Sequence, residues 1–296
     1  YEADTETKQD NGLELNTDNI KFDELIKAFV KENKPSVHIL TPCFGGMCHV
    51  NYVMCLSNTQ TLCQMYGIEL QVMFMQRDSL VTRARNNLIA KSMAIPSMTH
   101  IMFIDNDITW DPLDVIKLLL AEKDVVGGIY PLKNYNWDKI IPSAEDPNPI
   151  QTMLVKKNNS QVIQTIPDAL LIQNKLLNYN VNYLSDSIQI SKNLTQVKHL
   201  ATGFMMIRRN VIEQMFVEYA HLKYVDDVHA LVNDTEQSNA YALFDCEVID
   251  NHYYSEDWLF CHRWSQMQGK IWIDISIKLA HTGTEHFNGN YMASII

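Results

Sequence analysis

The chain has 296 residues, of which 46% are apolar and 20% are charged, values typical of a soluble globular protein with one large or two small domains. It carries 24 Lys plus Arg against 35 Asp plus Glu, a net charge of −11, which argues against general binding to nucleic acid or to anionic membranes. No apolar run approaches the roughly 18–20 residues of a membrane span.

The N-terminal part, residues 1–34, is predicted to lie outside the main domain. Residues 1–20 are polar and acidic and predict a loosely held arm, and the following segment FDELIKAFVKE (22–32) predicts a short helix. The six cysteines form no C-x-x-C pair. We therefore expect reduced thiols and a cytoplasmic protein.

Between residues 35 and 130 the sequence alternates between strand and helix patterns. Strands are predicted at 36–42, 69–76, 99–105 and 124–130, and helices at 50–66, 79–95 and 111–122. The second of these helices is expected to be capped by Asp78 or Ser79. Such alternation implies right-handed βαβ units and a mostly parallel sheet, whose ligands bind beyond the carboxyl ends of the strands.

The pattern changes after residue 130. Residues 131–195 are rich in Pro, Asn, Asp and Gln, with β-like pieces at 152–157 and 161–166, and predict a loop-and-hairpin insertion. The rest of the chain predicts a strand at 198–209, a helix at 211–220, a helix at 255–269 and a last strand at 270–283.

Two carboxylates, Asp105 and Asp107, follow the apolar run Ile101–Ile104, and three interpretations compete. The segment matches the hhhh-DxD-x-T pattern of haloacid-dehalogenase-like phosphatases, with Asp105 as the nucleophile, although two strand-helix units precede it here. The pair could instead hold a divalent cation that binds a nucleotide diphosphate. It could also only cap the helix that begins near Pro112.

The order of several motifs favours the second interpretation. In chain order they are RDSLVTRARNNL, IMFIDNDITWDP, VVGGIYPLK, ATGFMMIRR, SEDWLFCHRW and AHTG. This series resembles the GT-A-fold glycosyltransferases, family-two-like and inverting, of bacteria, phages and large DNA viruses. The resemblance implies an α/β fold with a Rossmann-like, mostly parallel central sheet flanked by helices, and a smaller mixed sheet toward the acceptor side.

The resemblance also implies a division of the chain. Residues 35–290 would form a single domain, with a nucleotide-binding half at 35–130, an insertion or lid at 131–195 and an acceptor-binding, catalytic half at 196–290. It implies a metal site for Mn²⁺ or Mg²⁺ formed by Asp105, Asp107 and His281, the last of these at the end of the last strand. Asp105 would reach the ribose of the nucleotide or a metal-bound water. Neutral imidazole is a common metal ligand.

For the donor, the resemblance implies a UDP-sugar. Asp78 would accept the uracil N–H, Thr41 and Pro42 would line the base pocket, and Arg85 and Asn86 would face the donor.

Three further positions would complete the donor site. Asn106 would contact the nucleotide, and Thr202 and Gly203 would shape the pocket for the donor sugar, where small residues permit close approach.

Asp257 matches the aspartate that acts as the general base in the inverting pattern. It would deprotonate a glycan acceptor, although Glu256 and Asp257 could also only compensate the dipole of a helix that begins there. The expected activity is thus transfer of a sugar from a UDP-sugar to a glycan or another hydroxyl acceptor, with inversion. A non-catalytic carbohydrate-binding protein on the same scaffold is the remaining alternative.

Overall fold

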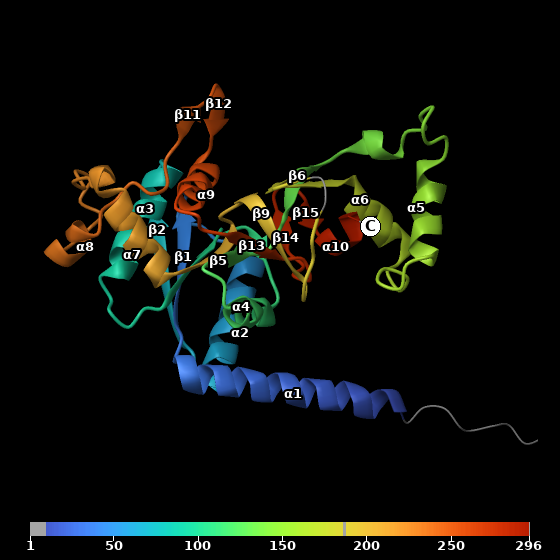
Figure 1. Ribbon diagram of the computed structural model, residues 1–296, viewed down its shortest axis with the longest axis horizontal. Coiled ribbons are helices and arrows are strands. Elements are labelled where there is room, and N and C mark those ends of the chain that lie inside the picture. The colour runs from blue at the N-terminus through green and yellow to red at the C-terminus, as the bar shows by residue number, and fades with distance from the viewer. Residues whose placement is uncertain (1–9, 186–187, 296) are drawn as a thin grey trace, which may run out of the picture.

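The first helix of the protein lies along one side of the molecule. The structure, a computed structural model, describes residues 10–185 and 188–295. In it, α1 (Asp10–Asn33) forms a long helix below the central sheet in the view of Figure 1. Ile26 and Val30, four residues apart, are buried on its inner side. The expected arm is thus wrong from residue 10 onwards, where the chain is helical, and residues 1–9 lie outside the described residues.

The alternation expected between residues 35 and 130 is confirmed. Its elements are β1 (Ser36–Cys43), α2 (Val50–Tyr66), β2 (Glu69–Gln76), α3 (Val81–Met93), β3 (His100–Ile104), α4 (Pro112–Leu120) and β5 (Val125–Gly127). The expected cap of α3 is wrong, because Leu80 is its N-cap residue and makes no side-chain cap. Asp78 instead accepts a hydrogen bond from the Leu80 N–H at 3.0 Å.

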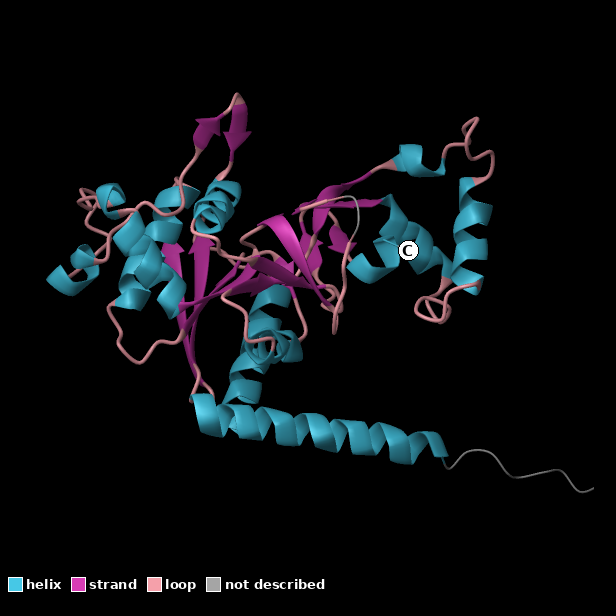
Figure 2. Ribbon diagram, in the orientation of Figure 1, coloured by secondary structure: helices cyan, strands magenta, loops and turns pink. Residues whose placement is uncertain are grey.

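The central sheet has eight strands in the order β2-β1-β3-β10-β5-β13-β9-β8. Figure 2 shows the strands in magenta through the middle of the molecule. Its later strands are β8 (Val181–Tyr183), β9 (Leu194–Leu200), β10 (Phe204–Arg208) and β13 (Ile271–Asp274). All strands except β9 and β10 run in the direction of β1. The fold is therefore α/β with a mixed sheet that is mostly parallel at its core.

Two apolar cores cover the two faces of this sheet. Because side chains alternate along a strand, Ile101 and Phe103 of β3 join one core, whereas Met102 and Ile104 join the other. The first core is closed by α3, α7 (Arg209–Glu218) and α9 (Glu256–Gln266), and the second by α2 and α4. The loops at the carboxyl ends of the strands are thereby fixed between two packed layers.

The segment 131–195 differs from the expected loop and hairpin. It contains β6 (Pro131–Tyr135), the 3₁₀ turn η1 (Trp137–Ile140), α5 (Pro149–Asn158), α6 (Asp168–Leu176), β7 (Leu177–Tyr179) and β8. Residues 152–157 are helical because Asn148 caps α5 and Pro149 occupies its first turn. Residues 161–166 form turns rather than a strand. Together with the C-terminal α10 (Tyr291–Ile295), these helices form the group at the right of Figure 1.

Smaller sheets flank the central one. A smaller sheet is present as expected, β15-β14-β4, formed by β4 (Ile108–Thr109), β14 (Ala280–Thr282) and β15 (His286–Asn288). Both of its pairings are antiparallel, so it is not the mixed sheet that was expected. The last predicted strand is thus divided between β13 and β14, and the strand predicted at 198–209 is divided between β9 and β10. The hairpin β11 (Glu247–Ile249) and β12 (His252–Tyr254) precedes α9.

Two short elements complete the chain between α7 and that hairpin, η2 (Ala220–Leu222) and α8 (Asp234–Ser238). Among the helices in the described ranges, none combines the length and the apolar character that crossing a membrane requires. Contact between α3 and α8 fixes this part of the chain beside the sheet.

Candidate active site

The segment Asp105–Asp107 connects β3 to β4 at the carboxyl end of the central sheet. The Asp105 N–H donates to the Gly203 carbonyl at 3.1 Å, and the Thr282 N–H donates to the Asp107 carbonyl at 2.8 Å. The backbone of the segment is thus held from two sides, by the turn before β10 and by β14. This fixes where the two carboxylates emerge.

Asp107 lies between two basic side chains. Lys133 of β6 has its Nζ 2.5 Å from Asp107 Oδ2, and His281 of β14 has its Nε2 3.4 Å from Asp107 Oδ1. Burial by itself would raise the pKa of the Asp107 carboxyl, but the hydrogen bonds from His281 and Lys133 outweigh it and lower this pKa to about 2. Asp107 is therefore a permanent anion near neutral pH.

The orientation of His281 is fixed through its other nitrogen. Nδ1 lies 2.9 Å from the Pro131 carbonyl oxygen, which can only accept, so Nδ1 carries a proton. With Nδ1 protonated, Nε2 donates to Asp107 only through a second ring proton, and a metal ion could take the place of that proton between the two groups. A carbonyl on the second nitrogen is the usual support of a metal-ligating histidine.

Arg85 forms a second cation-carboxylate group beside the first. Its side chain, from α3, is buried; Nη2 lies 3.1 Å from Asp105 Oδ1 and Nε lies 3.4 Å from Glu256 Oε1. Burial opposes the charge, yet the facing carboxylates of Asp105 and Glu256 raise the pKa of Arg85 above its ordinary value. The guanidinium also lies over the Phe103 ring, 5.1 Å from its centroid.

Asp257 lies in the first turn of α9 and is buried. Burial raises the pKa of its carboxyl, although a hydrogen bond from the Ser255 hydroxyl partly offsets this. In the described part of the chain, both hydrogen bonds that Asp257 accepts, from Ser255 and from the Trp258 N–H at 2.9 Å, go to Oδ1. A carboxylate with a raised pKa and an uncommitted oxygen is suited to accept a proton.

Three residues predicted to contact the nucleotide have partners within the protein. The buried Thr41 hydroxyl contacts the Tyr52 hydroxyl at 2.5 Å and donates to the Ile104 carbonyl at 2.9 Å. Asp78 forms an ion pair with Arg83, with Nη2 2.8 Å from Oδ1.

Asn86 bonds to the backbone of one residue, with its Nδ2 2.7 Å from the Phe244 oxygen and its Oδ1 2.9 Å from the Phe244 nitrogen. Pro42 is half-buried at the end of β1. For Asn86 and Pro42, as for Thr41 and Asp78, contact with a nucleotide stays a prediction.

Asn106 fixes the loop that leads into α2. Its Nδ2 donates to the Met47 carbonyl at 2.7 Å, and its own carbonyl accepts from the His49 N–H at 3.1 Å. The small-residue turn between β1 and α2 is thereby tied to the segment that carries Asp105 and Asp107. Whatever binds to these two carboxylates will therefore lie beside this loop.

Thr202 and Gly203 lie in the turn before β10, and Thr202 is buried. A Cβ on Gly203 would come within 2.6 Å of the Tyr130 ring, and the Gly203 N–H donates to the Tyr130 hydroxyl at 3.2 Å. The small residue therefore permits the close approach of Tyr130, whose ring in turn packs edge-on against His281 with centroids 5.0 Å apart. Contact of this turn with a donor sugar stays a prediction.

Two charged residues of the site were missing from the predicted set. Glu256 appeared only as the neighbour of Asp257, yet it is the second partner of Arg85. Lys133 ends the motif VVGGIYPLK, but nothing in its local pattern distinguishes it from a solvated lysine. Its contact with Asp107 joins residues 26 apart and depends on the path of β6.

The donor set around Asp107 is suited to a metal ion that is only partly enclosed by protein. Within residues 10–185 and 188–295, no group of three or more His, Cys, Asp or Glu side chains could by itself hold a metal ion. Asp107 and His281 provide one carboxylate and one imidazole. Mg²⁺-class ions commonly take one or two protein ligands and complete their shell with water and substrate phosphate, so the residues present fit such an ion.

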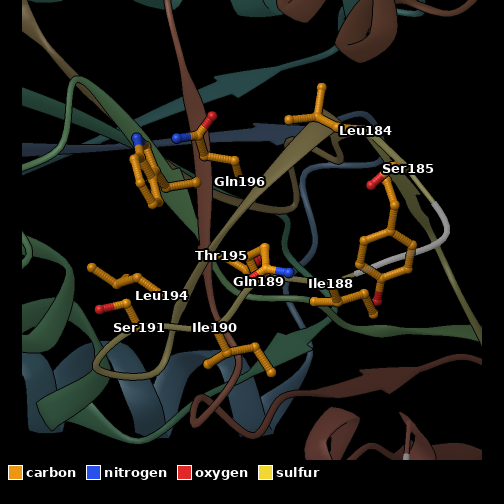
Figure 3. A pocket seen from close by; sticks show the side chains of 11 residues that line it. Leu184, Ser185, Ile188, Gln189, Ile190, Ser191, Leu194, Thr195 and Gln196 are labelled. Atoms are coloured by element: carbon orange, nitrogen blue, oxygen red, sulfur yellow. The ribbon is translucent and has the colours of Figure 1, made fainter.

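A cavity of about 400 Å³ is lined by other residues, whose side chains Figure 3 shows as sticks. Its lining comes from the segment around β8 and β9 and from Trp272 of β13, with Thr195 and Gln196 on β9. The residues described as lining it include neither Asp107 nor Arg85. The chemistry-bearing side chains therefore cluster at the carboxyl edge of the sheet, not in this cavity.

Comparisons with known proteins give structural likeness only. No protein-family model matches the chain, and no curated protein does. Among solved structures, A197 from STIV is similar with a TM-score of 0.45 at 13% identity, over 86% of this chain and 94% of that one. A glycosyltransferase involved in the glycosylation of the major capsid of PBCV-1 has a TM-score of 0.28 at 10% identity, over 63% and 66%. The 4-diphosphocytidyl-2C-methyl-D-erythritol synthase from Anaerococcus prevotii has a TM-score of 0.30 at 8% identity, over 70% and 96%.

Proposed function

We propose that the chain is a metal-dependent glycosyltransferase that transfers a sugar from a UDP-sugar to a glycan hydroxyl with inversion. The observation that carries the proposal is the contact of Asp107 with His281 at the carboxyl edge of the sheet. His281 presents Nε2 to the carboxylate because its Nδ1 donates to the Pro131 carbonyl. This arrangement would hold two side chains ready to bind Mn²⁺ or Mg²⁺ before the donor arrives.

The charges of the site support a requirement for a metal ion. The site holds four carboxylates and two cations, namely Asp105, Asp107, Glu256 and Asp257 against Arg85 and Lys133. Without His281 in the count, their formal sum is 2 − 4 = −2. A diphosphate would be repelled by this sum. A bound divalent cation would cancel it and would stabilise the negative charge of the departing nucleotide diphosphate.

Arg85 would hold the side chains around the donor in place and would bind the donor itself. Its guanidinium holds Asp105 and Glu256 together, and its Nη1 is buried without a partner in the described part of the chain. A buried unpaired donor of this kind is costly. A donor phosphate or sugar hydroxyl that reached Nη1 would remove that cost, so we assign Arg85 to donor binding.

Asp257 would act as the general base. Burial raises the pKa of its carboxyl, which makes it a stronger base than an exposed aspartate. Its Oδ2 would take the proton of an acceptor hydroxyl while the hydroxyl oxygen attacks the sugar C1 and the bond from C1 to the diphosphate oxygen breaks. Ser255 and the Trp258 N–H would hold the carboxylate in position through Oδ1.

Ligand binding tests the proposal most directly. UDP- and GDP-sugars are added with and without Mn²⁺ while thermal unfolding is followed; a ligand at 100 times its Kd stabilises the protein by about 2.7 kcal/mol. We expect a shift with UDP-sugars only in the presence of Mn²⁺, and slow hydrolysis of at least one of them. The absence of any shift with every nucleotide, with or without metal, would refute the proposal.

Two variants separate metal binding from catalysis. Asp107→Asn should abolish Mn²⁺-dependent binding of UDP, whereas Asp257→Asn should keep that binding and lower kcat by about 10²–10⁴-fold, the usual contribution of a general base. Asp227→Asn, at an exposed position, controls for the loss of one negative charge. Equal behaviour of the first two variants would contradict the assigned roles.

The same assays identify the alternatives. Turnover of a generic phosphomonoester that Asp105→Asn abolishes would replace the proposal with a phosphatase. Binding of glycans without hydrolysis of any nucleotide-sugar would replace it with a carbohydrate-binding protein.

A further inference from the structure

We infer that Lys133 is a built-in cation that competes with the metal ion for Asp107 and then pairs with the donor diphosphate once the metal is bound. The inference rests on the proposed function, because it requires a metal ion at Asp107. It concerns a residue that neither the sequence pattern nor the comparisons assign.

Both oxygens of Asp107 are already occupied. Lys133 Nζ lies 2.5 Å from Oδ2 and His281 Nε2 lies 3.4 Å from Oδ1. A metal ion that binds this carboxylate must therefore displace a contact or share an oxygen with it. Because an ammonium and a divalent cation repel each other strongly at such distances, the ammonium cannot stay where it is.

Of the two partners, Lys133 is the one free to move. His281 is held by the hydrogen bond from Nδ1 to the Pro131 carbonyl and by the edge of the Tyr130 ring. The Lys133 side chain is 36% exposed, and in the described ranges Asp107 is its only ion-pair partner. A flexible four-carbon stem lets its ammonium shift without any change in the backbone.

A displaced ammonium at this position would meet the incoming diphosphate. Asp105 and Glu256 already have a cation, because Arg85 contacts both of them, and Asp257 accepts hydrogen bonds from Ser255 and the Trp258 N–H. The donor phosphates would therefore be the unpaired anions within reach of Lys133. Its charge would thus oppose metal binding in the empty protein and favour nucleotide binding in the metal-loaded protein.

Gly283 makes room for Lys133 in its present position. A Cβ at residue 283 would come within 2.8 Å of Lys133 Cδ, in the middle of the stem that carries the ammonium to Asp107. Gly283 is exposed, so alanine there should displace the lysine stem rather than unfold the protein. Gly283→Ala therefore weakens the contact between Lys133 and Asp107 without removing the charge.

Two affinities measured on the full chain test the inference. The first is the affinity for Mn²⁺ alone, from electron paramagnetic resonance of the free ion, and the second is the affinity for UDP at saturating Mn²⁺, from calorimetry. Lys133→Met should bind Mn²⁺ about tenfold more tightly than the wild type, as expected when a competing ion pair is removed, and UDP about tenfold more weakly. Gly283→Ala should also bind Mn²⁺ more tightly but keep the UDP affinity, because its ammonium is still present.

Lys270→Met is the matched control. Lys270 is exposed and directly precedes β13, at the end of that strand opposite to the site, and its replacement should change neither affinity.

The outcomes separate the inference from the proposed function. Unchanged or weakened Mn²⁺ affinity in Lys133→Met would overturn the competition, and the proposed metal site would still stand as long as the wild type binds Mn²⁺. If no variant and no wild-type sample binds Mn²⁺, the proposed metal site itself fails and the inference fails with it. Opposite changes of the two affinities in Lys133→Met, with Lys270→Met unchanged, would support it.

Discussion

Replacing His199 should flatten the dependence of stability on pH. His199 lies on β9, is 4% exposed, and stacks on Trp258 with ring centroids 4.9 Å apart. Its Nδ1 lies 3.1 Å from Asn182 Nδ2; with that amide nitrogen as donor, the ring proton is on Nε2, which is buried without a partner in the described part of the chain. Burial lowers the pKa of His199 to about 4, with a smaller contribution from the charge of Lys198.

The sign and size of this pH effect follow from the difference between the pKa of His199 in the folded chain and in the unfolded chain. An unfolded histidine titrates near pH 6.5, so the unfolded chain binds the proton first as the pH falls. The contribution of His199 to stability is complete above about pH 6.5 and is lost as the pH falls toward the folded pKa of about 4. With these two pKa values, the loss between pH 7.5 and pH 5 is about 2 kcal/mol.

Urea unfolding at pH 7.5, 6 and 5 measures this loss, with tryptophan fluorescence as the signal. His199→Phe keeps a ring to stack on Trp258, and His199→Gln does not, but both remove the titrating group. The free energy of unfolding of the wild type should therefore fall by about 2 kcal/mol more than that of either variant over this range. The two variants should differ from each other by a constant offset. Parallel curves for all three proteins would refute the reasoning.

Further substitutions test the contacts around the site. Arg85→Met leaves Asp105 and Glu256 without their cation and should lower the free energy of unfolding by about 3–5 kcal/mol in urea titrations. The control Arg208→Met breaks an exposed ion pair and should lower it by at most about 1 kcal/mol. Equal losses in the two variants would contradict the burial of the Arg85 pairs. Gly203→Ala brings a Cβ within 2.6 Å of the Tyr130 ring and should cost about 1–3 kcal/mol, measured by thermal unfolding; an unchanged Tm would contradict the close approach.

The central part of the fold was predictable because its periodicity is strong. The apolar run Ile101–Ile104 is buried on both faces, as expected for a central strand, and α4 begins where Asp111 and Pro112 signal a start. Asp111 accepts from the Leu113 N–H at 2.9 Å, and Asp114 closes the capping box. Local signals of this kind need no knowledge of the rest of the chain.

The strand predicted at residues 152–157 is wrong because the prediction used apolar composition alone and ignored the helix start signal before it. TMLVKK at 152–157 has a β-like composition, but Asn148 and Pro149 precede it, and the Asn148 side chain accepts from the Gln151 N–H at 3.4 Å. This pair indicates a helix start, so the error in α5 was avoidable from sequence.

The ionic contacts of the site were not predictable in the same way. Arg85 and Glu256 are 171 residues apart, and their pairing depends on α3 and α9 covering the same face of the sheet. Lys133 reaches Asp107 because β6 packs beside β14. Composition and spacing identify candidate residues, but they do not tell which cation belongs to which carboxylate.

The spacing of Asp105 and Asp107 has a physical reason that appears only in the structure. With one residue between them, the two carboxylates leave the turn after β3 toward different partners: Asp105 toward Arg85, and Asp107 toward His281 and Lys133. Each backbone is held separately, one by the Gly203 carbonyl and one by the Thr282 N–H. An extra residue inserted after Asp105 would leave its pair with Arg85 in place and would carry Asp107 out of register with β14. The one-residue spacing thus gives the two carboxylates separate basic partners.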